Sequence, residues 1–91
     1  MINYEDNEIY IVFIINNHYV RWEIFSLTTD MKEVYLLLKH KYGINKCILE
    51  VNDFIIANYN NDYLLTLIQR QNTNTFYVTT AKNYKLDKSI F

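Results

Sequence analysis

The chain has 91 residues and a formal net charge of −1, and 51% of its residues are hydrophobic. This length allows one domain at most, and the hydrophobic share is too high for a disordered chain. The balanced charge argues against a dedicated binder of the DNA backbone, which needs a basic excess to displace counterions. We expect a single domain over residues 1–91, with an ordered core at about 8–82 and flexible ends at 1–7 and from about residue 83.

Composition and the N-terminal residues favour a soluble, cytoplasmic protein. Cys47 is the one cysteine, so no intramolecular disulfide can form, which fits a reducing compartment. The polar N-terminus is unlike a signal peptide, and the longest apolar run, Ile9 to Ile15, is far shorter than the roughly 20 residues of a spanning helix. Abundant Asn, Ile, Tyr and Lys have AT-rich codons, which is compatible with a virus, a mobile element, an AT-rich bacterium or a parasite.

Two strands joined by a tight turn are predicted near the start of the chain. Residues 8–15 are rich in β-branched and aromatic residues and apolar on both faces, which favours a central strand. Asn16-Asn17 is a two-residue turn signal, because asparagine tolerates a positive φ. Residues 18–27 follow as the second strand.

A two-residue turn fixes the register of this hairpin, starting with Ile15 opposite His18. One face then holds only apolar pairs, namely Phe13 with Val20, Ile11 with Trp22 and Ile9 with Ile24. The other face is mixed and pairs Ile14 with Tyr19, Val12 with Arg21 and Tyr10 with Glu23. We expect the first face to be buried and the second to be the outer face of the sheet.

A helix is predicted between residues 28 and 43. Any of Thr28 to Asp30 can cap its start, and Glu33 stands three residues after Asp30, as in a capping box. Gly43 stands where a left-handed residue ends a helix. The apolar stripe recurs at helical spacing and comprises Met31, Val34, Leu37 or Leu38, and Leu38 or Tyr42.

The second half of the chain predicts strands around one ambiguous segment. In chain order we expect a strand at 46–51, a turn at Asn52-Asp53, a short strand at 54–56, a loop at 57–62 and a last strand at 75–81. Alternation places Cys47, Leu49 and Val51 on one face. Residues 63–69 fit either a short helix capped by Asp62 or a strand that turns at 72–74. The fold class is α+β, with one helix packed on a mixed sheet of four to five strands.

This order of elements resembles the ubiquitin-like β-grasp family, which has a tight hairpin, a helix that ends in glycine, two more strands, a short helical turn and a last strand beside the first. The helix closes with Lys41 to Ile44, and Asp62-Tyr63 lies where the family has its short helical turn. The resemblance covers about residues 8–82 and implies a ββαββ(x)β arrangement that presents a sheet face to partners. The chain ends in Lys88-Ser89-Ile90-Phe91 without a Gly-Gly tail, so conjugation is not expected.

The outer face of the expected sheet is the predicted binding surface. The resemblance places the first strand between the second and the last, so that their outward side chains are neighbours. Aromatic and aliphatic groups with a charged rim are typical of a protein-binding surface. The expected contact residues are Tyr10, Val12, Ile14, Tyr19, Arg21, Ile48, Tyr77 and Thr79, with Arg21, Glu23 and Glu50 at the rim. The alternatives are that the C-terminal tail or a second copy, in a homodimer, covers this face.

We expect neither an enzyme nor a cofactor or metal site. Cys47 with His18 or His40 suggests a nucleophile pair, but Cys47 alternates with core residues and fits a small apolar side chain better. No spacing of Cys and His indicates a zinc site. One glycine cannot build a phosphate-binding loop. The acidic residues of the N-terminus fit a solvated segment better than acid–base catalysis.

The predicted function is that of a non-catalytic interaction module that binds and modulates a partner protein. An inhibitor of a host defence protein, encoded by a virus or mobile element, is one form of this function. The alternative is a small nucleic-acid-binding α+β domain. Tyr19, Arg21, Trp22 and Tyr77 suggest stacking on bases, but the expected register turns Trp22 inward and leaves Tyr19 and Arg21 outward.

Overall fold

The computed structural model of the chain describes residues 4–5, 7–56 and 62–80, which contain six strands and two helices. The strands are β1 (Tyr4–Glu5), β2 (Glu8–Ile15), β3 (Tyr19–Ser26), β4 (Cys47–Val51), β5 (Phe54–Ile56) and β6 (Thr75–Thr80). The helices are α1 (Met31–Tyr42) and α2 (Leu64–Gln71). The expected loop at 57–61, the end of the last strand at residue 81 and the expected flexible tail lie outside the described residues.

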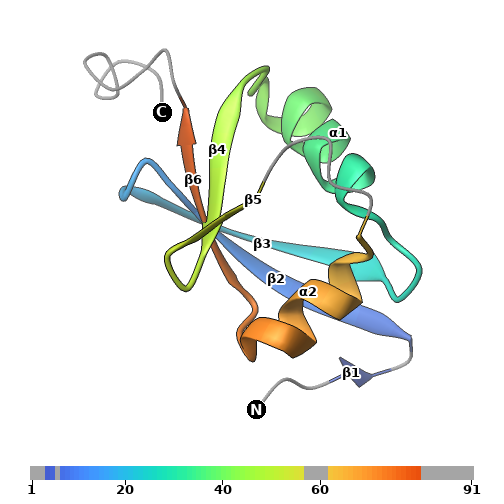
Figure 1. Ribbon diagram of the computed structural model, residues 1–91. Coiled ribbons are helices and arrows are strands. Elements are labelled where there is room, and N and C mark those ends of the chain that lie inside the picture. The colour runs from blue at the N-terminus through green and yellow to red at the C-terminus, as the bar shows by residue number, and fades with distance from the viewer. Residues whose placement is uncertain (1–3, 6, 57–61, 81–91) are drawn as a thin grey trace.

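The strands form one mixed sheet (Figure 1). The strand β2 is antiparallel to β3 on one side and parallel to β6 on the other. The strand β6 also pairs with β4, and β4 pairs with β5, so the long strands lie in the order β3-β2-β6-β4-β5. The two hairpins, β2–β3 and β4–β5, are therefore joined through β6.

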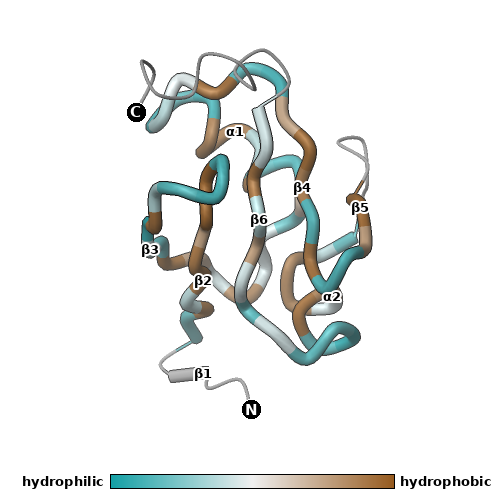
Figure 2. The backbone as a smooth tube through the Cα atoms, turned by 90° about the vertical axis from the view of Figure 1, so that its left-hand side faces the viewer, coloured by the Kyte–Doolittle hydropathy of each residue, from teal (hydrophilic) through white to brown (hydrophobic). Residues whose placement is uncertain are grey.

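Both helices cover the same face of this sheet, here called the inner face, and Figure 2 looks onto the opposite, outer face. The buried side chains of the helices belong to one core with alternate residues of the strands. From the helices these are Met31, Val34, Leu38, Leu64, Leu67 and Ile68. From β2 they are Ile9, Ile11, Phe13 and Ile15. The result is a two-layer α+β domain with one buried sheet face.

Phe13 lies at the centre of the core. Its ring is fully buried and packs edge-on against Phe25 of β3 and Phe76 of β6, with centroids 6.3 and 6.1 Å apart. Edge-to-face pairs of this kind add to the roughly 1.5–3 kcal/mol that each buried ring contributes by leaving water. Phe13 thus joins the strands on both sides of β2.

The helix α1 begins and ends as the sequence predicts. Asp30 is its N-cap, since the Asp30 Oδ1 accepts the Glu33 N–H at 2.9 Å and the Asp30 N–H donates to the Glu33 Oε1 at 3.0 Å. Gly43 follows the helix with φ at 71°, and its N–H donates to the Lys39 carbonyl. The capping box and the left-handed glycine satisfy backbone groups that a helix leaves open at its ends.

The described part of the chain contains two helices, whereas the predicted fold class had a single helix. The segment left open by the sequence forms α2, because Leu64, Leu67 and Ile68 recur at helical spacing and meet the core. Asp62 does not cap it. The Asp62 carbonyl instead accepts the N–H of Met31, the first residue of α1. A further addition is β1, which pairs with the start of β2 in a region that was expected to be flexible.

Asparagine and aspartate supply the left-handed backbone positions that the single glycine cannot. Among the described residues, the non-glycine positions with positive φ are Asn7, Asn16, Asn17, Asn52, Asp53 and Asn72. Short polar side chains tolerate this region because they bond locally to the backbone. The predicted turn at Asn52-Asp53 between β4 and β5 is confirmed.

The register of the β2–β3 hairpin differs from the prediction by one residue. Asn16-Asn17 is left-handed and the His18 N–H donates to the Ile15 carbonyl at 3.0 Å, as expected of the turn. His18 nevertheless stays in the turn, and Tyr19 pairs with Ile15. The pairs are therefore Ile14 with Val20, Phe13 with Arg21, Val12 with Trp22, Ile11 with Glu23, Tyr10 with Ile24 and Ile9 with Phe25.

Contacts to β6 explain the longer turn. The Asn16 N–H donates to the Val78 carbonyl at 2.7 Å, which continues the ladder between β2 and β6 past Ile15. The Asn16 side chain donates to the Thr80 Oγ1 and accepts the Thr80 N–H, both at 3.0 Å. Asn16 is thus held by β6, and a third residue completes the connection to β3.

Replacement of Gly43 by alanine should lower the free energy of unfolding by about 1 kcal/mol, because a left-handed φ strains residues that carry a Cβ. A Cβ added at Gly43 would have no contact within 4 Å, so the loss of stability comes from backbone strain alone. Urea unfolding measures it. Gly43→Asn is the control and should lose less, since asparagine tolerates this region. An equal loss in both variants would contradict the explanation.

Candidate functional site

The outer face of the sheet is apolar across its width. Seven large side chains on it are at least 37% exposed, namely Tyr10, Val20, Trp22, Ile24, Ile48, Ile55 and Tyr77. Trp22 is the most exposed, at 64%. Val12, Ile14 and Thr79 lie between them and are half-buried. Single exposed hydrophobic residues are normal on a protein surface, whereas a continuous group of this kind marks an interaction site.

One row of side chains crosses all five long strands. Val20 of β3 pairs with Ile14 of β2, and Ile14 pairs with Tyr77 of β6. Tyr77 pairs with Glu50 of β4, and Glu50 pairs with Ile55 of β5. At about 4.8 Å between neighbouring strands the row is about 19 Å long. The outer face is therefore broad enough to meet a folded partner.

The charges on the outer face are acidic. Glu50 lies in the row described above, and Glu8 of β2 accepts a hydrogen bond from the Tyr10 hydroxyl at 3.0 Å. A shallow hollow beside Tyr77 is lined by Glu50, Asn52 and Asp53. The outward positions of the described strands include neither lysine nor arginine. The face is thus largely apolar, and its carboxylates lie at separate places: Glu8 at the start of β2, and Glu50 level with Ile14 near the end of β2.

The structure places some of the expected contact residues on the outer face and others elsewhere. The expected residues that lie on the outer face are Tyr10, Val12, Ile14, Ile48, Tyr77 and Thr79, with Glu50 at the expected rim. Tyr19, Arg21 and Glu23 were expected there and lie on the inner side of β3. Trp22 was expected in the core and is exposed. The one-residue longer turn causes these errors, and it is also why Val20, Ile24 and Trp22 were missed.

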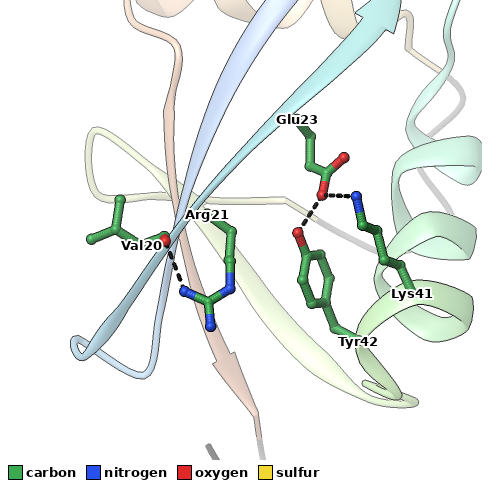
Figure 3. A network of polar contacts seen from close by, with 5 residues as sticks. All are labelled: Val20, Arg21, Glu23, Lys41 and Tyr42. Atoms are coloured by element: carbon green, nitrogen blue, oxygen red, sulfur yellow. Dashed lines mark hydrogen bonds and ion pairs between the residues drawn. The ribbon is translucent and has the colours of Figure 1, made fainter.

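Glu23 instead anchors β3 to α1. Glu23 is 7% exposed and its carboxylate lies 2.9 Å from the Lys41 ammonium. The same oxygen accepts a hydrogen bond from the Tyr42 hydroxyl (Figure 3). A buried carboxylate requires such partners, since burial without them costs several kcal/mol. Burial, and then the hydrogen bond to Glu23, raise the pKa of Tyr42 to about 12.

Arg21 lies along the edge of β3. Its guanidinium donates to the Val20 carbonyl at 2.9 Å (Figure 3). It also lies over the Tyr19 ring, 5.3 Å from the centroid. The side chain therefore covers a backbone acceptor of β3 and does not project from the outer face.

The residues considered for catalysis are dispersed. Cys47 is half-buried at the start of β4, and burial raises the pKa of its thiol to about 11. The thiol is therefore protonated at neutral pH, whereas nucleophilic attack needs the thiolate. His18 lies in the β2–β3 turn and His40 on an exposed position of α1. Within the described ranges, no three His, Cys, Asp or Glu side chains are grouped so as to hold a metal.

Comparison of the chain with protein-family models, with curated proteins and with solved structures finds no match in any of the three. The geometry of the outer face is therefore the basis for a functional assignment. Neither of the two described helices has the length and apolar character needed to cross a membrane.

Cys47 should react slowly with iodoacetamide in the folded protein. A pKa of about 11 in place of 9.0 lowers the thiolate fraction near neutral pH about 100-fold. Mass spectrometry of the native protein and of the urea-unfolded protein at equal pH measures the ratio of rates. Equal rates in the two states would show a reactive thiol and revive a nucleophilic role.

Replacing Tyr42 by phenylalanine should lower the free energy of unfolding by about 1–2 kcal/mol, because the buried Glu23 loses a hydrogen bond. The folded-state pKa of Tyr42 lies above its ordinary value of 10.0, so this stabilisation is complete below pH 10 and is lost as the pH rises towards 12. Urea unfolding of both proteins at a series of pH values should therefore show a difference that shrinks above pH 10. Tyr63→Phe, at an exposed position, is the control and should change little. A difference between wild type and Tyr42→Phe that does not depend on pH would argue against the contact.

Proposed function

We propose that the chain is a non-catalytic interaction module that binds a partner protein through the outer face of its sheet. The supporting observation is the row from Val20 to Ile55, apolar except for Glu50, which crosses five strands on the side that neither described helix covers. Apolar surface in water is unfavourable and is removed when a partner packs against it. Trp22 and Tyr77 are residue types that contribute strongly at the centres of interfaces.

The charges of the outer face define the chemistry of the partner. Glu50, Glu8 and Asp53 lie among or beside the apolar side chains, so a matching surface has aliphatic or aromatic groups at its centre and lysine or arginine around them. The same carboxylates repel phosphate groups, which makes nucleic acid a poor ligand for this face. The stacking role suggested for Tyr19 and Arg21 loses its basis, since both side chains lie on the inner side of β3.

A ubiquitin-like β-grasp relationship is part of this proposal. The order β3-β2-β6-β4-β5, the parallel pairing of β2 with β6 and the helix that follows the first hairpin support it. A shared fold does not identify a partner, which depends on the residues of the surface. Small size and the AT-rich residue usage support a cytoplasmic viral or mobile-element inhibitor as one form of the module.

Capture from a host lysate with paired variants tests the proposal. Tyr77→Ala on the outer face is matched by Tyr63→Ala on the helical side, and Ile48→Asp is matched by Leu36→Asp on α1. All four replace exposed side chains, so the fold should persist in each. We expect the two outer-face variants to lose the captured protein, with affinity lowered about 10- to 100-fold, and the two controls to retain it.

Two results would contradict the proposed surface. One is a partner that both outer-face variants retain. The other is a partner lost only in Leu36→Asp or Tyr63→Ala, which would place the interface on the helices. A shift of labelled single-stranded RNA or DNA by the wild-type protein that weakens with salt would favour the nucleic-acid alternative.

A further inference from the structure

The strand β3 has one open edge. In the described part of the chain it pairs only with β2, over eight residues. The N–H groups of Val12 and Asn16 in β2 point to β6, so the alternate residues of β2 direct their backbone groups to β3. It follows that Val20, Trp22 and Ile24 turn their N–H and C=O groups away from β2. The Val20 carbonyl fits this direction, since it accepts the Arg21 guanidinium at the edge.

An open edge of this length is a template for another strand, and charged side chains decide which strand can pair with it. Arg21 and Glu23 lie two residues apart on the inner side of β3. Like charges directly opposite each other destabilise a strand pair, and opposite charges stabilise it. Glu23 already has Lys41 and Tyr42 as partners within the chain, whereas the Arg21 guanidinium contacts only the Val20 carbonyl and the Tyr19 ring among the contacts described above. A second copy of β3 can place a carboxylate opposite Arg21, which most other strands would not.

Only some self-pairings bring these charges together. Antiparallel pairing centred on Trp22 places Arg21 opposite Glu23 of the second copy and, by symmetry, Glu23 opposite Arg21 of the second copy. Val20 and Ile24 then face each other on the outer side. Centring on Arg21 places two guanidinium groups opposite each other, and centring on Glu23 places two carboxylates opposite each other. The charges thus favour one register and penalise its neighbours.

We infer that the chain forms a two-fold symmetric dimer in which β3 pairs antiparallel with β3 of a second copy, centred on Trp22. The outward backbone groups of Trp22 supply the central hydrogen-bonded pair. The two sheets become one continuous sheet, and the same surface is used on both copies, as two-fold symmetry requires. Both outer faces lie on the same side of the joined sheet.

The contacts that Glu23 and Arg21 make within one copy are compatible with this pairing. Lys41 and Tyr42 hold one oxygen of the Glu23 carboxylate, while the other oxygen points away from both side chains (Figure 3). In the dimer the Val20 carbonyl accepts the Ile24 N–H of the second copy. The Arg21 guanidinium, which covers that carbonyl in the single copy, turns to the carboxylate opposite. The inference concerns the edge of β3 and does not depend on partner binding by the outer face.

Exchange of the two charges tests the dimer by sedimentation velocity. In an Arg21→Glu dimer, carboxylates lie opposite carboxylates at positions 21 and 23. In a Glu23→Arg dimer, guanidinium groups lie opposite guanidinium groups. Each variant alone should therefore dimerise at least about tenfold more weakly than wild type. In an equimolar mixture every facing pair joins a carboxylate of one variant to a guanidinium of the other, and the dimer should return. Arg70→Glu, on α2, is the control for net charge, and Ile48→Asp is the control for the outer face. Both should dimerise like wild type.

A cysteine crosslink tests the register without disturbing the Glu23 contacts. In a Cys47→Ala background, Trp22→Cys places two thiols at a hydrogen-bonded pair with Cα atoms about 5.5 Å apart, within disulfide range. Val20→Cys places its two copies about 14 Å apart, since Val20 faces Ile24. We expect rapid oxidation to a covalent dimer for Trp22→Cys and little for Val20→Cys.

Three results would overturn the inference. A wild-type chain that stays monomeric at about 1 mM has no functional edge pairing. A mixture of the charge variants that stays monomeric, with both variants folded by circular dichroism, excludes the proposed register. If Glu23→Arg does not fold, the crosslink decides, and equal crosslinking of Val20→Cys and Trp22→Cys rejects centring on Trp22. A dimer lost only in Ile48→Asp would instead place the second copy on the outer face.

Discussion

The length of the β2–β3 turn controls which chemistry each side of the sheet presents. Because side chains alternate along a strand, one residue more or less in the turn exchanges the two faces of β3. With His18 inside the turn, Trp22 reaches solvent and Glu23 reaches the core side. Hydrogen bonds from β6 to Asn16 set the length of the turn. The contacts of Asn16 with Val78 and Thr80 therefore determine which side chains β3 presents on the outer face.

The same register places a charged residue, Glu23, at a buried position on the inner side of β3, where apolar residues are usual. Glu23 is buried beside α1 and is tolerated because Lys41 and Tyr42 satisfy its carboxylate. Replacing such a group by an apolar residue of similar volume often leaves stability unchanged or improves it. The contribution of Glu23 is therefore better sought in specificity than in stability. It fixes the end of α1 over β3 and gives the edge of the sheet a defined charge next to Arg21.

Much of the fold could be predicted from the sequence because its signals were local. β-branched and aromatic residues located β2, alternation located β4, and Asp30, Glu33 and Gly43 marked both ends of α1. The register could not be predicted, since the hydrophobic pattern of β3 indicated the wrong face. Val20, Trp22 and Ile24 resemble a core face and are exposed, whereas Arg21 and Glu23 lie on the inner side. Asn16-Asn17 fits a connection of two or three residues equally well. The contacts that decide, from Asn16 to Thr80 and from Glu23 to Tyr42, join segments far apart in the sequence.

The position of β6 between two hairpins has a consequence for synthesis on the ribosome. The β2–β3 and β4–β5 hairpins are complete in the nascent chain before β6 is made, yet each then has an edge that β6 occupies in the folded chain. Asn16 and Thr80 are separated by 64 positions, so their contact closes a loop that includes nearly the whole domain. Until residue 80 has left the exit tunnel, the two hairpins are present but β6, which lies between them in the sheet, is missing. A nascent chain in this state exposes both the apolar inner face and unpaired strand edges, which is the condition in which chaperones bind and neighbouring chains exchange strands.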